Sequence, residues 1–262
     1  MAQTGGLTRP AFVGADAVTL LRVVLIATAL AIWQAVSVSG LLFRDVVPSL
    51  GAITGALAGL LTDRSFYGNL GVTGLEIAIA LAIGGLAGLA VGLALGANRL
   101  LGKAFEPYLY YLGPTPKIIF FPVMIMWFGV GPGSKVAMGV ISCFFPIALS
   151  TAAGMRQIDR VLIRVGRSFR ARTWQMVSKI YLPAMRVPVV NGVRLGLGVA
   201  VIGTLLAETK LSNRGVGFLV INSYSTFDMP RMYALLIVVF VIAIGANALV
   251  GRLSAGRPHA KP

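Results

Sequence analysis

The polar residues of this chain that could do chemistry gather in one interval, Arg156 to Pro188, which lies between two apolar runs. The interval has one acid, Asp159, and eight basic residues: Arg156, Arg160, Arg164, Arg167, Arg170, Arg172, Lys179 and Arg186. Apolar residues recur beside them at helical spacing: Ile158, Val161, Leu162, Val165 and Phe169, then Trp174, Val177 and Tyr181. This pattern predicts two short amphipathic helices, joined near residues 170–172 and ended by Pro183. Two interpretations fit them, a basic hairpin lying on anionic lipid and a docking surface for a protein partner.

Residue sets for catalysis or metal binding are not predicted. The chain has one histidine, His259 in the tail, and one cysteine, Cys143, inside an apolar run, so metal ligands are too few and no intrachain disulfide can form. The glycine-rich turn at residues 129–135 lacks the Gly-Lys-Ser/Thr ending of a phosphate loop. Two acids in apolar runs, Glu76 and Glu208, are expected to be isolated from each other, which disfavours a membrane-embedded enzyme. We therefore predict no catalytic residues, no cofactor and no metal.

The elements that position these residues are membrane helices. The chain has 262 residues, of which 57% are apolar and 12% charged, and its mean hydropathy is +0.86. Its apolar runs are close to the length of about 20 residues that crosses a bilayer. We predict an all-α membrane protein with about six transmembrane helices, at Val23–Phe43, Thr73–Ala97, Tyr108–Phe128, Val136–Gly154, Val189–Ala207 and Tyr233–Val250. Residues 48–63 suit an interfacial helix, with a seventh span as the alternative.

The distribution of charge predicts the orientation of these helices. With six spans, the basic loops and both termini fall on one side, which the positive-inside rule makes cytoplasmic. The net charge of +15 is then a topology signal that needs no nucleic acid to explain it. We expect a cytoplasmic N-terminal segment at residues 1–22, a membrane domain at 23–251 with its polar loop at 156–188, and a cytoplasmic tail at 252–262.

Several residues within the spans could line or border a pathway. A glycine occurs every fourth residue at Gly84, Gly88, Gly92 and Gly96, which suits close packing within one subunit or a seam beside a moving pathway. Four prolines (Pro107, Pro114, Pro116 and Pro122) should kink the third helix or make it begin late. Lys117 between them either reaches the cytoplasmic headgroups or faces the pathway. Pathway candidates on the fifth helix are Asn191, Arg194 and Glu208, and for Glu208 interfacial anchoring is an equal alternative.

The polar loop resembles a motif of the inner-membrane permeases of bacterial ATP-binding-cassette importers. Their cytoplasmic loop has a Glu-Ala-Ala triplet, a glycine four residues after it, and an Ile-x-Leu-Pro ending. Here Ile180, Leu182 and Pro183 match the ending, whereas Arg164, Val165 and Gly166 stand at the triplet and Arg170 at the glycine. The acid and the glycine of the motif are therefore absent. Because Arg170 carries a Cβ, we expect the bend between the two loop helices to take another geometry.

The resemblance extends from about residue 48 to 251 and points to the nitrate/sulfonate/taurine branch. It is carried by 114–117 (Pro-Thr-Pro-Lys), 121–129 (Phe-Pro-Val-Met-Ile-Met-Trp-Phe-Gly), 144–146 (Phe-Phe-Pro), 192–195 (Gly-Val-Arg-Leu), 207–208 (Ala-Glu) and 215–217 (Gly-Val-Gly). It implies a permease dimer that forms the pathway, two cytoplasmic ATPase subunits and an external substrate-binding protein. The implied ATPase-coupling residues are Arg164, Val165, Gly166, Arg167, Ser168, Phe169, Arg170, Ala171, Arg172, Ile180, Leu182 and Pro183.

The resemblance implies import of a small anion or organic solute, of the sulfonate, taurine, nitrate or vitamin-precursor type, into a bacterial cell across its cytoplasmic membrane. ATP hydrolysis would then belong to a separate subunit. The alternative from another class is a secondary carrier or channel that works without an ATPase. Inverted repeats or paired intramembrane acids would favour that alternative, and the sequence suggests neither.

Overall fold

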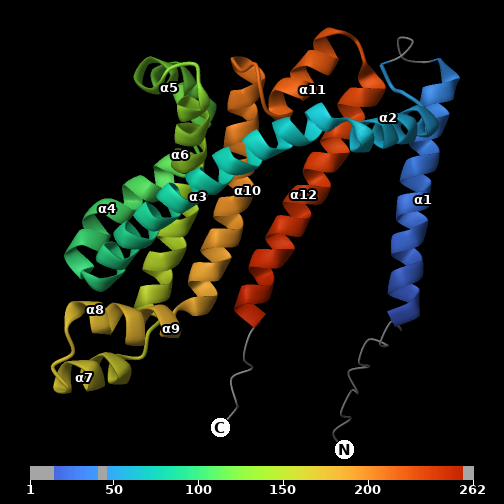
Figure 1. The fold of residues 1–262 in the computed structure, drawn as a ribbon. Helices are drawn as coiled ribbons and strands as arrows, with labels where there is room; N and C mark the ends of the chain where they lie inside the picture. Colours follow the sequence, from blue (N-terminus) through green and yellow to red (C-terminus); the bar gives the residue numbers. More distant parts are fainter. Residues whose placement is uncertain (1–14, 41–45, 256–262) are drawn as a thin grey trace, which may run out of the picture.

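The structure is a computed structural model that describes residues 15–40 and 46–255, and the regular elements in these ranges are helical. The elements are α1 (Ala15–Ser39), α2 (Leu50–Thr62), α3 (Arg64–Ala97), α4 (Arg99–Leu112), η1 (Lys117–Phe120), α5 (Phe121–Phe128), α6 (Pro132–Arg156), α7 (Arg160–Ser168), α8 (Thr173–Met176), η2 (Val177–Tyr181), α9 (Leu182–Ala184), α10 (Arg186–Lys210), α11 (Val216–Ser225) and α12 (Met229–Ala255). Figure 1 shows the long helices running between two ends of the molecule, with α7–α9 at one end and α5, α2 and α11 toward the other.

Within residues 15–40 and 46–255, five helices are long and apolar enough to cross a membrane: α1, α3, α6, α10 and α12. The helix pair α4 and η1–α5 passes the same test only when taken together, as a sixth span that is broken by a 93° bend. The all-α membrane fold is confirmed, and so is the prediction that the prolines interrupt the third span, Tyr108–Phe128. Pro114 and Pro116 have no backbone N–H to donate, so the helix ends at Leu112 and restarts at Lys117.

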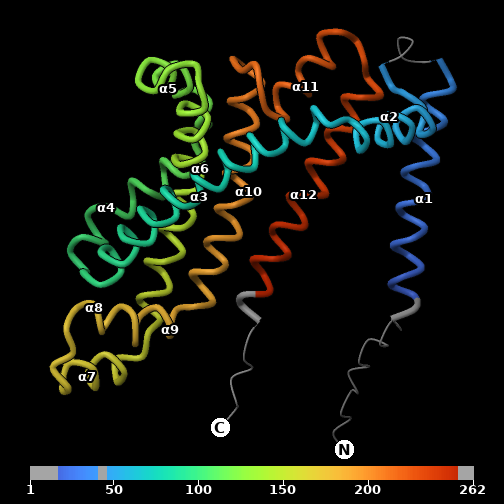
Figure 2. The backbone as a smooth tube through the Cα atoms, viewed as in Figure 1, coloured from blue at the N-terminus to red at the C-terminus, as the bar shows by residue number. Residues whose placement is uncertain are grey.

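The glycine stripe of α3 packs against α6. A Cβ on Gly84, Gly88, Gly92 or Gly96 would come within 3 Å of α6 atoms, so only glycine permits this approach. Cys143 lies in the same contact, fully buried, where it serves packing. The stripe is therefore a helix contact within one subunit. Figure 2 shows α6 between α3 and α10, and α10 in turn beside α12.

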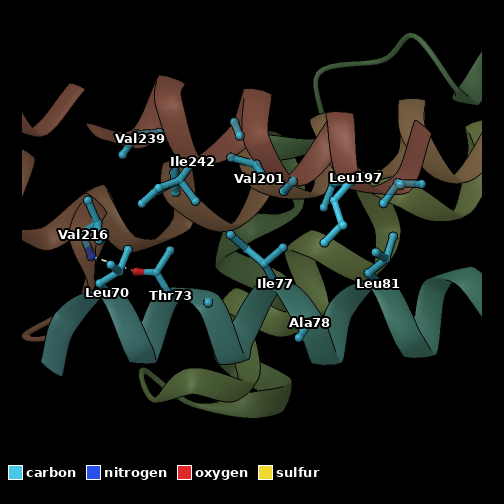
Figure 3. A pocket seen from close by; sticks show the side chains of 16 residues that line it. Leu70, Thr73, Ile77, Ala78, Leu81, Leu197, Val201, Val216, Val239 and Ile242 are labelled. Carbon is cyan, nitrogen blue, oxygen red and sulfur yellow. Dashed lines mark hydrogen bonds between the residues drawn. The ribbon is translucent and has the colours of Figure 1, made fainter. Parts of the chain in front are cut away.

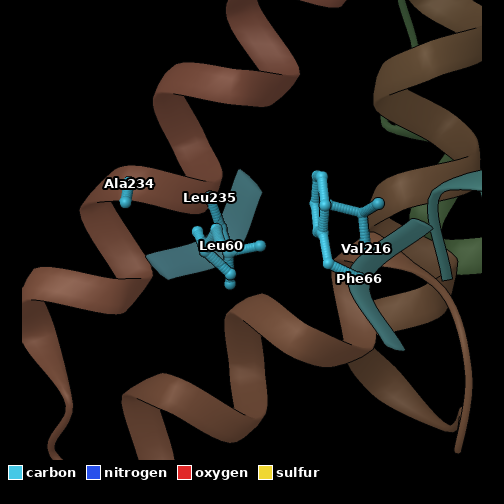
Figure 4. Packing of buried hydrophobic residues seen from close by; sticks show 5 residues of the cluster. All are labelled: Leu60, Phe66, Val216, Ala234 and Leu235. Atoms are coloured by element: carbon cyan, nitrogen blue, oxygen red, sulfur yellow. The ribbon is translucent and has the colours of Figure 1, made fainter. Parts of the chain in front are cut away.

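A compact apolar cluster lies at the end of the molecule opposite α7–α9. Leu60 of α2, Phe66 of α3, Val216 of α11 and Ala234 and Leu235 of α12 are buried together there (Figure 4). α2 is only 13 residues long and crosses the end of α12, so it is not one of the helices long enough to span. Its position at the membrane interface stays a prediction.

α1 stands apart from the other long helices along most of its length (Figure 1). It contacts them at its C-terminal end, where the Trp33 indole N–H donates to the Pro48 carbonyl at 3.0 Å and the Trp33 ring meets Tyr233 edge-on. The predicted end of this helix at Phe43 lies outside the described residues. The start of α1, the end of α12 and α7–α9 all lie toward the same end of the molecule (Figure 2), and the side of the membrane that this end faces stays a prediction.

Candidate coupling surface and membrane site

The two halves of the polar loop meet at Gly166. α7 begins after Asp159, whose carboxylate accepts from the backbone N–H of Val161 at 2.8 Å. A Cβ on Gly166 would collide with the Ile180 side chain and lie 2.6 Å from the Met176 sulfur. Gly166 and Ile180 come from opposite ends of the motif, so the loop closes where they touch.

Arg170 adopts a backbone conformation that favours glycine, although it carries a Cβ. Its φ is +50°, in the left-handed region. The Ala171 N–H donates to the Gly166 carbonyl at 3.1 Å, and the Arg170 N–H donates to the Arg167 carbonyl at 2.9 Å. This pair of bonds is a Schellman ending of α7. The expected change of geometry is not seen in φ, because the helix-end hydrogen bonds hold Arg170 in the left-handed region that glycine favours, despite its Cβ.

The second half of the loop does not end at Pro183. α8 continues into η2, a π-helical turn in which the Leu182 N–H bonds the Val177 carbonyl, and then into α9, which contains Pro183 near its start. A proline ring crowds the carbonyl four residues before it, and the wider π turn relieves this crowding. The helical path therefore passes Pro183 and stops at Met185, just before α10.

The loop leaves large apolar side chains uncovered. Phe169 is 83% exposed and Trp174 is 75% exposed. The basic and apolar residues of α7 are exposed together: Arg160, Val161, Leu162, Arg164, Val165 and Arg167. Ile158 is the exception, because it is buried with Met155 and Met185 under the loop. We call the exposed residues of 160–174 the coupling surface, after the ATPase-coupling role that the family resemblance predicts for this loop.

The remaining predicted coupling residues support this surface from beneath or lie at its edge. Ile180 and Leu182 are half-buried, and Leu182 packs on the cluster under the loop. Ser168, Arg170, Arg172 and Pro183 are exposed, and Ala171 is half-buried. The motif thus contributes both the fold of the loop and its uncovered face.

Glu208 is fully buried and ties three helices together. Its carboxyl accepts from the Thr73 hydroxyl of α3 at 2.7 Å and from the Gly217 N–H at the start of α11 at 2.6 Å. The Thr73 oxygen in turn accepts from the Val216 N–H at 2.8 Å, as Figure 3 shows. A Cβ on Gly215, which has φ +102°, or on Gly217 would run into this carboxyl. In this subunit Glu208 is therefore a core hydrogen-bond acceptor.

Glu76 and Lys135 belong to the same buried region, which the sequence did not reveal. Glu76 is 5% exposed and interacts with Glu208, so the expectation that these acids are isolated from each other was wrong. Lys135 is 1% exposed and interacts with both acids. Its ammonium also donates to the Leu211 carbonyl at 2.7 Å. Residues distant in sequence meet here through helix packing. The apolar periodicity of a single helix could not predict these contacts between helices.

The three predicted pathway candidates are not brought together. Asn191 is exposed, and Arg194 donates from Nε to the Asn247 amide oxygen of α12 at 3.0 Å. Arg194 lies about 21 Å from Glu208 along α10, at a rise of about 1.5 Å per residue. Within the described residues, no group of three or more His, Cys, Asp or Glu could hold a metal ion.

A separate hollow of about 320 Å³ lies between α3, α10 and α12 (Figure 3). Its walls are apolar side chains such as Ile77, Val201 and Ile242, and Thr73 is the polar one. None of the pathway candidates lines it. The hollow has no charged group to bind a polar solute.

Comparison with known proteins places this geometry in a family. Residues 84–257, which include the broken span and the whole polar loop, match the binding-protein-dependent transport system inner membrane component. The chain belongs to this permease family. Over 216 residues it is 28% identical to the putative aliphatic sulfonates transport permease protein of Bacillus subtilis, covering 82% of this chain and 78% of the relative. Over 196 residues it is 29% identical to the taurine transport system permease protein of Escherichia coli, covering 73% and 71%.

The permease fold is also found among solved structures. A chain of the methionine ABC transporter MetNI, in an inward-facing conformation, superposes with a TM-score of 0.57 at 18% identity, covering 69% of this chain and 92% of that one. This likeness concerns the fold. The family match and the relatives in sequence confirm the predicted ABC importer permease of the sulfonate, taurine and nitrate branch.

Proposed function

We propose that this permease is the membrane subunit of an ATP-driven importer, in which two permease copies form the pathway. The assembly contains two copies of a cytoplasmic ABC ATPase, which bind the permease copies through the coupling surface. An extracytoplasmic binding protein delivers the solute. The solute is a small anion or organic molecule of the sulfonate, taurine, nitrate or vitamin-precursor type. ATP is hydrolysed on the separate subunit.

The observation that carries the proposal is the coupling surface itself. Two large aromatic side chains, Phe169 and Trp174, project from a short loop and are mostly exposed. Exposed aromatic residues beside arginines are typical of the centre of a protein interface. Because the loop is braced on the ends of α6 and α10, a push on it is transmitted to two spanning helices.

The charge on the coupling surface indicates what the partner offers. Arg160, Arg164, Arg167 and Arg170 are exposed and form no ion pair with another of the described residues. A groove with acidic residues around an apolar floor would complement them. The same charges support placing this end of the molecule in the cytoplasm, and a reporter fused at Pro262 tests that orientation.

The matched test uses two exposed tryptophans at opposite ends of the molecule. Trp174 in α8 is 75% exposed and Trp127 in α5 is 72% exposed. For Trp174→Ala we expect a loss of about tenfold or more in affinity for the cognate ATPase, the size of an interface hot spot. Trp127→Ala should bind the ATPase normally. Affinity is measured by co-purification at graded ATPase concentrations.

Equal ATPase binding by the two variants would contradict a coupling role for this surface. Uptake by the reconstituted permease without any ATPase would establish the secondary carrier instead. A reporter signal from Pro262 outside the cell would contradict the proposed orientation.

A further inference from the structure

The broken third span places a lysine at its break. α4 ends at Leu112, and the chain passes Pro114 and Pro116 before η1 begins at Lys117. The last carbonyls of a helix lack partners within that helix. The Lys117 ammonium donates to two carbonyls beside this end, those of Gly113 and Thr115, the second at 3.3 Å.

Lys117 lies near the middle of the membrane span. Its ammonium is 5.1 Å from the centre of the Phe145 ring, on α6. Phe145 is near the midpoint of α6, about 20 Å from Pro132 and about 17 Å from Arg156 at the helical rise of about 1.5 Å per residue. The ammonium thus bonds to the broken helix at the level of the midpoint of α6.

This ammonium has no acidic partner within the residues that the structure describes. The two ion pairs found there join Arg156 to Glu106 and Arg231 to Asp63. Lys135 of α6 differs because it is fully buried and interacts with two acids. A charge at mid-depth without a counter-charge is costly and usually serves function.

The Lys117 side chain opens onto a hollow. This hollow has a volume of about 320 Å³ and is lined by Leu112, Thr115, Lys117, Phe120, Val140, Ile141, Phe144 and Phe145. Lys117 is only half-buried, so its ammonium is not sealed into the core. The Thr115 hydroxyl is already bonded to the Leu112 carbonyl at 2.7 Å. The hollow therefore combines one available positive charge with walls of aromatic and aliphatic groups.

We propose that Lys117 is an anion-binding residue of the translocation pathway. A sulfonate, nitrate or carboxylate oxygen accepts a hydrogen bond from its ammonium while the organic part of the solute lies against the aromatic wall. The carbonyl bonds at the end of α4 hold the lysine when no anion is present. This inference rests on the proposed importer function, and it adds the residue at which a negative charge is neutralised at mid-depth.

A labelling experiment tests the local charge without requiring transport. Cys143, the sole cysteine, is replaced by alanine, and Thr115→Cys then supplies one thiol beside Lys117. The thiol reacts with a sulfonate-bearing or a trimethylammonium-bearing methanethiosulfonate reagent. We expect the sulfonate reagent to react faster than the cationic reagent. Lys117→Met should lower the ratio of the sulfonate rate to the cationic rate at least threefold. Lys103→Met, at an exposed site on α4, should leave the ratio unchanged.

A rate ratio that Lys117→Met does not change would overturn the proposal, as would a Thr115→Cys thiol that reacts only after denaturation. Lys117→Arg provides a second variant, because it keeps the charge and should keep the ratio even where Lys117→Met accumulates poorly. These outcomes do not depend on the ATPase, so they separate this inference from the importer function.

Transport supplies the functional readout. With the cognate ATPase and binding protein in proteoliposomes, Lys117→Met should lower uptake of an anionic solute at least tenfold while ATPase binding stays normal. Lys117→Arg should retain uptake. Wild-type uptake without ATP would refute the importer, whereas normal uptake by Lys117→Met would refute only the role of Lys117.

Discussion

Replacing Arg170 by glycine tests the bend of the polar loop separately from the charge of the arginine. An L-residue in the left-handed region costs about 1–2 kcal/mol relative to its favoured conformations, and Arg170 lies there with φ +50°. Glycine removes this strain but loses about 0.5–1 kcal/mol through the greater freedom of the unfolded chain. The net expectation is a loop more stable by about 0.5–1 kcal/mol.

This gain is measurable in two backbone amides. The N–H groups of Arg170 and Ala171 make the bonds that end α7. In Arg170→Gly, hydrogen exchange at the amides of 170 and 171 should slow about two- to fivefold, since 1.4 kcal/mol corresponds to a factor of ten. ATPase affinity should be preserved or improved if position 170 serves only as a bend.

Arg170→Ala is the matched control, because it removes the charge and keeps a Cβ in the left-handed region. Exchange in Arg170→Ala should stay close to wild type. Faster exchange in Arg170→Gly, or the same slowing in both variants, would refute the assignment of strain to φ. ATPase binding lost equally in both variants would show that the guanidinium itself contacts the partner.

Three further changes probe the loop, the core and the end of the molecule opposite the loop. Gly166→Val should push α7 away from Ile180 and cost about 1–3 kcal/mol through overpacking, which co-purification with the ATPase would report as lost binding at normal membrane insertion. Glu208→Gln keeps the shape but weakens the acceptor of the Gly217 N–H, and thermal unfolding in detergent should show a loss of about 1–3 kcal/mol. Asp63 has a pKa that is lowered mainly by hydrogen bonds from Ser65. Its contribution to stability is therefore present above the ordinary pKa of 3.8 and is lost as the pH falls through the lowered pKa. Asp63→Asn should reduce the loss of stability at acid pH in the same unfolding assay.

Much of the structure of the polar loop could be predicted, because its helices depend on the pattern of neighbouring residues. Helical spacing located α7 and the bend after it, and the match at Ile180 aligned the motif on this chain. Two details were not predictable in the same way. The left-handed conformation of Arg170 depends on hydrogen bonds to the helix before it, and the path through Pro183 depends on a π turn.

The candidate residues in the membrane were harder to assign. Glu208 stood out as an acid near the end of an apolar run, which is equally consistent with anchoring and with lining a pathway. Its actual partners lie on α3 and α11, and Thr73 is 135 residues away in the chain. Lys135 ends the glycine-rich turn, and the sequence does not show that its side chain folds inward onto backbone carbonyls.

By itself the sequence determined the membrane class, the helical spans and the position of the polar loop, because apolar run length, charge and helical period are properties of neighbouring residues. Only the tertiary structure decided that Glu76, Lys135 and Glu208 form one buried region and that Lys117 sits over Phe145 at a break in a span. These are contacts between helices, and their register follows from how glycine faces and aromatic rings pack. A local pattern identifies which residues are charged, while the packing of the helices decides which charges have partners.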